Sequence, residues 1–253
     1  MDKKRINILN SLKNLGNKYS DLSIKKNLDD NQIKKRIICT EQISFDYSKQ
    51  RINQEVLDYL FTIPETLSMR DSIMSLSEGT FLNPSENRSV SHMLYRNHTL
   101  SQNNKLIHEE ETKVRTFLND FSSDKSNIKD VISICIGGSR IGPELLSQLN
   151  DEEFSKVNLH FCSSYDLLEL KSAIQKCQPD KTLVIISSKS FRTEEIIQNM
   201  NYIKLWLKDS LGENFDCNLY GISSNSLAMT EFGIKQENQF QILESLGGRF
   251  SIC

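Results

Sequence analysis

The sequence predicts an α/β protein, in which a parallel sheet is flanked by helices and preceded by a helical N-terminal arm. From about residue 127 onward, short apolar runs of strand length alternate with helical patterns, as is typical of repeated βα units. Two polar loops, 137–142 and 187–193, directly follow apolar runs, where parallel sheets bind ligands. The expected architecture is therefore a three-layer sandwich with a ligand site at one edge of its sheet.

The first 40 residues are expected to be mainly helical. Lysine and asparagine are frequent between residues 24 and 36, which is typical of a solvated surface helix without chemistry of its own. The apolar residues at helical spacing are Ile6, Ile8, Leu9, Leu12 and Leu15.

Two helices are expected between residues 43 and 77. Asp46 and Ser48 are both suitable N-caps for a helix that continues to about Tyr59. Pro64 is expected to end this helical segment. A second helix is expected over about 65–77.

A loop and two further helices are expected before the sheet. Asn83-Pro84 is a turn signal, and a helix after it would carry several polar side chains on one face. These are Arg88, His92, Tyr95 and Arg96. A lone histidine of this kind is usually a hydrogen-bonded core residue, so His92 is given no catalytic role. The next helix is expected from Leu106 to Phe121.

The residue pattern of the second half of the chain predicts the strands of the sheet and the helices between them. Strands are expected at 131–136, 157–162, 182–187 and 217–223, with a weak one at 240–243. Helices are expected at 143–149, 165–176 and 193–209. Because these elements alternate, the strands should be parallel with helices on both faces, and the loops 137–142 and 187–193 should share one edge.

The loop after the first strand reads Ile136-Gly137-Gly138-Ser139 and leads to Pro143, which suits the first turn of a helix. Adjacent glycines let backbone N–H groups approach an anion, and a helix start favours negative charge. The spacing matches neither the dinucleotide motif nor the P-loop. The loop therefore predicts a phosphate or sugar-phosphate cradle, the alternative being a tight turn that binds nothing.

A second anion site is predicted after the most hydrophobic strand. Within seven residues, the loop 187–193 offers four hydroxyl groups, one lysine and the N–H groups of a helix start. A phosphate dianion accepts several hydrogen bonds, so this composition suits it well. The alternative is that Thr193 merely caps its helix, with Glu195 supporting the first turn.

Near the end of the sequence, Gly247-Gly248 places Arg249 on a tight loop beyond a strand. A guanidinium in such a position can bind an oxyanion or stabilise one that develops in a reaction.

The composition of the chain argues against several classes of protein. The 31 basic and 33 acidic residues give a net charge of −2, so no basic surface predicts nucleic-acid binding. The apolar runs are too short to cross a membrane, and no signal-peptide core follows Met1. Six cysteines without a C-x-x-C pair favour a reducing cytoplasm. The four histidines show no metal-ligand spacing, so neither a metal nor another cofactor is expected.

Taken together, these motifs resemble the glucose-6-phosphate isomerase (phosphoglucose isomerase) family. They are Ile136-Gly137-Gly138-Ser139 with Gly142-Pro143, Ser188-Lys189-Ser190-Phe191 with Thr193-Glu194-Glu195, Gly247-Gly248-Arg249-Phe250-Ser251, Asp46 to Ile52, and Asn83 to Arg88 with His92 and Arg96. The resemblance covers about Asp46 to the end of the sequence.

The resemblance implies a fold of sugar-isomerase (SIS) domains, each a parallel sheet between helices. Residues 1–125 would form the helical N-terminal region and 126–253 the first SIS domain, with a second SIS domain absent from this chain. The implied reaction is the interconversion of glucose 6-phosphate and fructose 6-phosphate in glycolysis and gluconeogenesis. It uses no cofactor and passes through a cis-enediol, and the full-length enzyme is expected to be a homodimer.

The resemblance also implies roles for individual residues. Ser188, Lys189, Ser190 and Thr193 would hold the substrate phosphate, and Phe191 and Arg192 belong to the same substrate-binding loop. Gly138 and Ser139 would contact the sugar phosphate from the other loop, and Arg249 would stabilise the enediolate as the catalytic residue.

The sequence also departs from the family. Arg140 stands where the family often has aspartate, and no glutamate matches the motif of the family's base. The ring-opening histidine and the late lysine also have no match. Because proton transfer between adjacent carbons needs a positioned base, this chain alone is expected to be inactive. The alternatives are a non-catalytic sugar-phosphate-binding SIS module and, more weakly, a degenerate domain that acts only as a dimer partner.

Overall fold

The computed structural model describes residues 3–25, 30–85, 87–96, 104–122, 127–149 and 157–247. It divides into two compact units, Met1–Met74 and Ser75–Cys253. The sequence pattern changes later, near residue 126, because the residues before it are mainly helical in both units. The division into a helical region 1–125 and an SIS domain 126–253 stays a prediction.

The first unit is mainly helical. Its helices are α1 (Lys3–Lys18), α2 (Asp30–Lys35), α3 (Gln54–Thr66) and most of α4 (Met69–Ser77), and its strands are β1 (Ile37–Cys39) and β2 (Ser44–Asp46). The two strands pair antiparallel. Helix α1 lies against α3, where Lys18 Nζ lies 2.8 Å from Glu55 Oε1. The expected N-terminal helix is confirmed.

The expected helix starting at Asp46 or Ser48 is wrong. Asp46 ends β2, and its Oδ1 accepts a hydrogen bond from Ser48 N at 2.8 Å, so its side chain closes a turn. The helix begins at Gln54 because Asn53 caps it, accepting from Val56 N at 3.0 Å. Pro64 does not end α3 but lies in its last turn, where it removes only one N–H from the ladder.

The second unit opens with a short hairpin instead of the expected helix. Strands β3 (Leu82–Asn83) and β4 (Arg88–Ser89) pair antiparallel, followed by the 3₁₀ turn η2 (His92–Tyr95). Asn83 Oδ1 accepts from Ser85 N at 3.1 Å and from Ser85 Oγ at 2.9 Å, a local turn that competes with helix. The predicted helical face through Arg88 and His92 is therefore wrong, whereas the next helix is confirmed as α6 (Lys105–Ser122).

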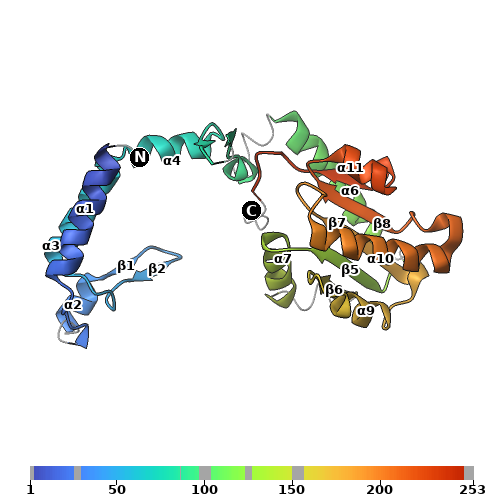
Figure 1. The fold of residues 1–253 in the computed structure, drawn as a ribbon, viewed down its shortest axis with the longest axis horizontal. Helices are drawn as coiled ribbons and strands as arrows, with labels where there is room; N and C mark the ends of the chain where they lie inside the picture. Colours follow the sequence, from blue (N-terminus) through green and yellow to red (C-terminus); the bar gives the residue numbers. More distant parts are fainter. Residues whose placement is uncertain are drawn as a thin grey trace. The chain divides into compact units, whose positions relative to one another are not determined.

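The five strands of the main sheet are parallel, in the order β6-β5-β7-β8-β9. Figure 1 shows four of them, β8, β7, β5 and β6, in succession across the sheet. Their bounds are β5 Asp130–Cys135, β6 Asn158–Cys162, β7 Thr182–Ser187, β8 Leu219–Ser223 and β9 Gln239–Gln241. The helices between them are α7 Gly138–Leu149, α9 Leu168–Ile174, α10 Glu194–Leu211 and α11 Ser226–Phe232. Short 3₁₀ turns are η3 Pro179–Lys181, η4 Gly212–Asn214 and η5 Gln236–Asn238.

The predicted α/β fold, with a parallel sheet flanked by helices, is confirmed. One difference concerns Pro143, which lies inside α7 and not in its first turn, since the helix already begins at Gly138. As the sixth residue of α7, Pro143 has no N–H to donate to the backbone oxygen of Ser139, so the helix lacks one hydrogen bond of its ladder there.

Helices cover both faces of the sheet. Alternate strand residues on one face, such as Ile134 and Ile186, belong to a buried cluster with side chains of α9, α10 and α11. On the other face, the rings of Tyr220 and Phe240 contact Phe117 of α6, with centroids 5.1 and 5.5 Å apart. Strand β7 is apolar almost throughout because both of its faces are covered.

The strand order contains one point at which the chain changes direction across the sheet. From β5 the chain moves outward to β6, and then returns to β7 on the other side of β5. In such sheets the crevice beyond the carboxyl ends of the two diverging strands is the usual ligand site. Among the described residues, no helix has the length and apolar composition to cross a membrane.

Candidate functional site

A polar cavity of about 720 Å³ lies beyond the carboxyl ends of β5, β7 and β8. Cys135, the last residue of β5, pairs with Ser187, the last residue of β7, so the two following loops emerge level with each other. The expectation that both loops share one sheet edge is confirmed. The predicted site residues that line the cavity are Ser139, Ser188, Lys189, Ser190, Arg192 and Thr193.

The loop after β5 turns on a single glycine. Gly137 has a φ of 58°, and a Cβ added there would meet nothing within 4 Å, so conformation and not space favours glycine at this position. Helix α7 then starts at Gly138. Ser139, in its first turn, reaches the cavity, while Gly138 is not among the residues that line it.

The loop after β7 holds its serine hydroxyls in defined positions. Ser188 Oγ accepts a hydrogen bond from Phe191 N at 3.2 Å, and Ser190 Oγ accepts from Arg192 N at 3.3 Å. A hydroxyl whose oxygen accepts from the backbone still has its own proton to donate. Both serines can therefore donate to an anion in the cavity without breaking the loop.

Phe191 anchors this loop in the core. Its backbone has a φ of 57°, in the left-handed region that a residue with a side chain rarely adopts. The ring is 3% exposed and packs edge-on against Phe232 with centroids 6.2 Å apart. As a predicted substrate-binding residue, Phe191 can thus act only through its position in the loop, because its side chain points away from the cavity.

Thr193 stands at the N-cap position of α10, but its side chain makes no capping hydrogen bond. The alternative in which Thr193 serves only as a cap is therefore not supported. Thr193 lines the cavity at the start of an 18-residue helix, where backbone N–H groups and the helix dipole attract an anion.

A third loop, after β8, completes the cavity and was missed in the sequence. Ser223 Oγ and Ser224 Oγ donate to the backbone oxygen of Lys189 at 2.8 and 2.9 Å. Asn225 Nδ2 donates to the backbone oxygen of Ser190 at 3.1 Å. Hydrogen bonds from the loop after β8 thus hold the backbone of the loop after β7 in place. The sequence signal was available, since Ser224-Asn225-Ser226 directly follows the strand predicted at 217–223.

The charges around the cavity are mainly positive. Lys189, Arg192 and Arg88 line it, together with the carboxylate of Glu244. Arg88 Nη1 lies 3.7 Å from Glu244 Oε1, so part of the positive charge is compensated inside the protein. The remaining balance favours an anionic ligand.

Arg140, the residue that departs from the family pattern, is directed away from the cavity. Its guanidinium lies 3.0 Å from Glu144 and 3.1 Å from Glu169, and it also donates to Ser163 Oγ. The hydrogen bond to Glu144 has the largest effect and raises the pKa of Arg140; burial opposes it, and the bond to Glu169 raises the pKa further. Burial alone would raise the pKa of Glu169, but bonds from Ser163 N, Arg140 and a second backbone N–H bring it below its ordinary value. Arg140 therefore braces α7 against the start of α9.

The predicted catalytic residue Arg249 lies outside the described residues, which end at Gly247. Its role stays a prediction. The predicted absence of a base motif is equally untested by the geometry of this cavity, in which Glu244 is the only carboxylate among the described lining residues.

Comparison with known proteins decides the family. A family model described as phosphoglucose isomerase matches residues 46–253. The chain belongs to the phosphoglucose isomerase family. The match begins at Asp46, where the resemblance in the sequence was expected to begin, and that expectation is confirmed.

Individual relatives agree with this family. Glucose-6-phosphate isomerase of Buchnera aphidicola subsp. Schizaphis graminum is 33% identical across 98% of this chain and 49% of its own length. The protein of the same name from Buchnera aphidicola subsp. Cinara cedri is 32% identical across 82% of this chain and 41% of its own length. The chain thus spans about half the length of the curated relatives that it matches.

The fold is also that of a solved member of the phosphoglucose isomerase family. The crystal structure of a glucose-6-phosphate isomerase from Chlamydia trachomatis D/UW-3/Cx matches 96% of this chain and 49% of its own, with a TM-score of 0.74. The sequence identity is 19%, so this likeness shows the fold alone.

Proposed function

We propose that this chain supplies the phosphate-binding half of a glucose-6-phosphate isomerase site, acting on glucose 6-phosphate and fructose 6-phosphate in glycolysis and gluconeogenesis. The observation that carries the proposal is the convergence of two loops on one polar cavity at the switch point of the sheet. Family membership supports the substrate class. No observation favours the alternative of a non-catalytic SIS module.

In this proposal the loop after β7 holds the phosphate. Ser188, Ser190 and Thr193 donate their hydroxyl protons, and Lys189 supplies positive charge. Phosphate oxygens also accept from the N–H groups at the start of α10. These contacts are made equally in the ground state and the transition state, so they hold the substrate and do not by themselves lower the barrier.

In the same proposal the loop after β5, which neighbours the loop after β7, also contacts the sugar phosphate. Ser139 presents its side chain at the cavity, and Gly138 offers backbone at the start of α7. A phosphate bound between the two loops fixes the sugar chain in one direction. The reacting carbons are thereby oriented for chemistry at the far end of the molecule.

Isomerisation itself moves a proton between adjacent carbons and needs a positioned base. We infer that Arg249 stabilises the negative charge of the enediolate. None of Glu194, Glu195, Glu231 and Glu244 matches the motif of the family's base, and the ring-opening histidine and late lysine have no match either. This polypeptide by itself is therefore proposed to bind the sugar phosphate without turning it over.

We also propose that the full-length form is a homodimer and that the protein is cytoplasmic. Apolar side chains of α7 that are exposed in this chain support association with further polypeptide: Ile141, Leu145, Leu146 and Leu149. Free thiols at all five described cysteines support a reducing compartment. Light scattering of the full-length form measures the first proposal directly.

Titration calorimetry with fructose 6-phosphate tests the main proposal, with fructose as the ligand that lacks the phosphate. We expect fructose 6-phosphate to bind and fructose to bind far more weakly, because the phosphate makes most of the contacts. A Ser210→Ala chain, changed at an exposed position at the end of α10, is the control and should bind as the unchanged chain does. Equal binding of the two sugars would overturn the phosphate role of this cavity.

A coupled assay with purified chain, free of host isomerase, tests the proposed lack of turnover. Conversion of fructose 6-phosphate to glucose 6-phosphate by this chain alone would show that the base is present and was missed.

A further inference from the structure

Three potential metal ligands converge at the edge of the sheet opposite the sugar-phosphate cavity. Asp130 is the first residue of β5, His160 lies in the middle of β6, and Cys177 follows α9 on the way to β7. One carboxylate oxygen, one imidazole nitrogen and the sulfur all lie within 4.8 Å of one another. The cavity lies beyond the last residues of the strands, and none of these three residues is among those that line it.

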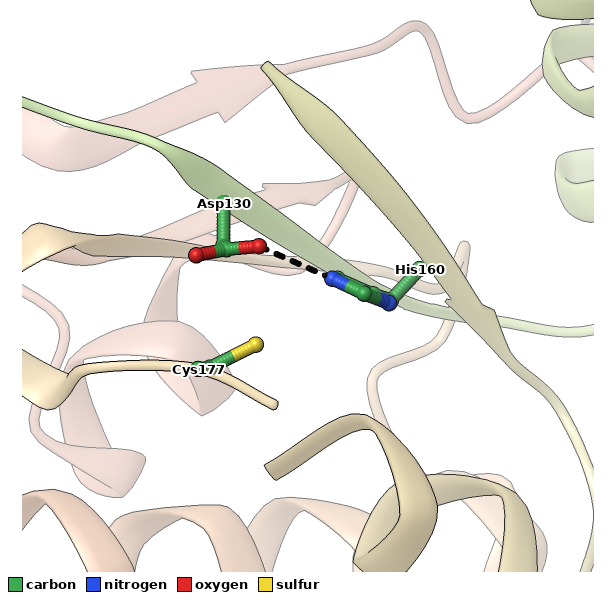
Figure 2. A group of neighbouring side chains, drawn as sticks. All are labelled: Asp130, His160 and Cys177. Carbon is green, nitrogen blue, oxygen red and sulfur yellow. Dashed lines mark hydrogen bonds and ion pairs between the residues drawn. The ribbon is translucent and has the colours of Figure 1, made fainter. Parts of the chain in front are cut away.

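The side chains face one another across a small space (Figure 2). His160 Nε2 lies 3.1 Å from Asp130 Oδ1, and the sulfur of Cys177 points toward the same carboxylate. Asn158 Nδ2 donates to Asp130 Oδ1 at 3.0 Å. A partner of this kind, which fixes the orientation of a ligand, is typical of metal sites.

A structural hydrogen bond between Asp130 and His160 accounts for two of the three side chains. Cys177, whose sulfur is the third potential ligand, comes from a separate segment and interacts through side-chain hydrogen bonds with Asp130 and Thr182. A bound Zn²⁺ ion would displace the proton of this thiol. The proposed isomerase chemistry uses none of the three. A carboxylate, an imidazole and a thiolate together form a ligand set suited to Zn²⁺, which takes three protein ligands and water in its open sites.

We propose that Asp130, His160 and Cys177 bind one Zn²⁺ ion, with water in the fourth position. Tetrahedral zinc with its usual bond lengths places ligand atoms about 3.3–3.6 Å apart. The Asp130–His160 pair is already near this spacing. The thiol then needs to approach the other two ligand atoms by about an ångström, which rotation of a cysteine side chain can supply.

The burial of Asp130 and His160 and the charge of the ligand set are both compatible with a bound Zn²⁺ ion. The side chain of Asp130 is 9% exposed and that of His160 18%, so a carboxylate there is largely removed from water. Zn²⁺ with one carboxylate and one thiolate forms a neutral complex, which reduces the cost of burying these charges. The exposed part of His160 leaves a path by which the ion can enter.

Such an ion would also stabilise the folded unit. It would connect β5, β6 and the segment before β7, three places that are far apart in the chain. Because the ligands are brought together only by the folded sheet, binding of the ion is linked to folding of this unit.

The test uses the whole chain, freed of metal with a chelator and then titrated with Zn²⁺ in competition with a chromophoric chelator. We expect one Zn²⁺ per chain and a rise in the midpoint of thermal unfolding. With Co²⁺ in place of Zn²⁺, we expect the charge-transfer absorption of a thiolate ligand. Loss of an orienting partner alone typically weakens metal binding about 10- to 100-fold, so Cys177→Ser and His160→Gln should weaken Zn²⁺ binding at least about tenfold.

Cys217→Ser is the matched control, because Cys217 is an exposed cysteine in the same unit. It should bind Zn²⁺ and Co²⁺ as the unchanged chain does. No Zn²⁺ binding at micromolar concentrations would overturn the proposal, as would a thiolate–cobalt absorption that survives in Cys177→Ser or disappears in Cys217→Ser. If circular dichroism shows that Cys177→Ser is unfolded, the His160→Gln chain, changed at a more exposed position, becomes the deciding variant. Unchanged Zn²⁺ affinity of a folded His160→Gln chain would overturn the proposed site.

Discussion

Replacing Thr193 with alanine separates phosphate binding from helix capping. Thr193 lines the cavity and stands at the N-cap of α10, but its hydroxyl makes no capping hydrogen bond. Loss of a hydroxyl that does cap typically costs about 1 kcal/mol of stability. Thr193→Ala should therefore change the free energy of unfolding by less than about 0.5 kcal/mol, the usual range for such positions.

The effect on binding should be much larger. A hydrogen bond to a charged group contributes about 1.5–3 kcal/mol, so loss of the Thr193 hydroxyl should weaken fructose 6-phosphate binding roughly 10- to 150-fold. Calorimetric titration measures the affinity, and urea unfolding measures the stability of the same sample.

Asn225 is the comparison for helix capping, because its side chain accepts a capping hydrogen bond at the start of α11. Its Oδ1 accepts from Ala228 N at 3.0 Å, so Asn225→Ala should lower the stability by about 1 kcal/mol where Thr193→Ala does not. Unchanged affinity in a folded Thr193→Ala chain would refute the phosphate contact. A stability loss in Thr193→Ala equal to that of Asn225→Ala would show that its hydroxyl is a cap after all.

Three further predictions follow from the loops and their supports. Asn225→Ser keeps an oxygen for the cap, but its shorter side chain no longer reaches the backbone oxygen of Ser190 as the amide Nδ2 does. We therefore expect stability close to that of the unchanged chain and fructose 6-phosphate binding weakened roughly 2- to 13-fold, the equivalent of about 0.5–1.5 kcal/mol. Phe191→Ala removes a ring that is 3% exposed and should cost about 3–5 kcal/mol in urea unfolding; a loss below 1 kcal/mol would show that the ring is not in the core. The pKa of Glu169 is below its ordinary value in the folded chain, so its contribution to stability is present above the unfolded carboxyl pKa of about 4.3 and is lost as the pH falls through the lower folded value. Glu169→Gln should therefore flatten the acid limb of stability measured against pH, and an unchanged limb would contradict the bonds from Ser163 N and Arg140.

The strands and most helices could be predicted from the sequence because their signal is local. The run 182–187 was predicted as a strand with the bounds that the structure shows, since a strand covered on both faces is apolar at every position. Helix α6 was equally clear from its helical spacing. Where side chains compete with the backbone for hydrogen bonds, the pattern misled: Asp46 closes a turn at a position where a helix was expected to begin. The turn predicted at Asn83-Pro84 is confirmed, but the helix expected after it is replaced by β4 and η2.

The sequence by itself determined the family, the parallel βα architecture and the two loops with phosphate-binding composition, because each of these lies in a short run of residues. The tertiary structure decided which of those residues meet. It placed the ring of Phe191 in the core and brought Ser224 and Asn225 into hydrogen-bonding contact with the loop 187–193. It also assembled Asp130, His160 and Cys177 from three segments. Such contacts depend on strand order and register, which pair residues far apart in the chain and leave no fixed spacing in the sequence.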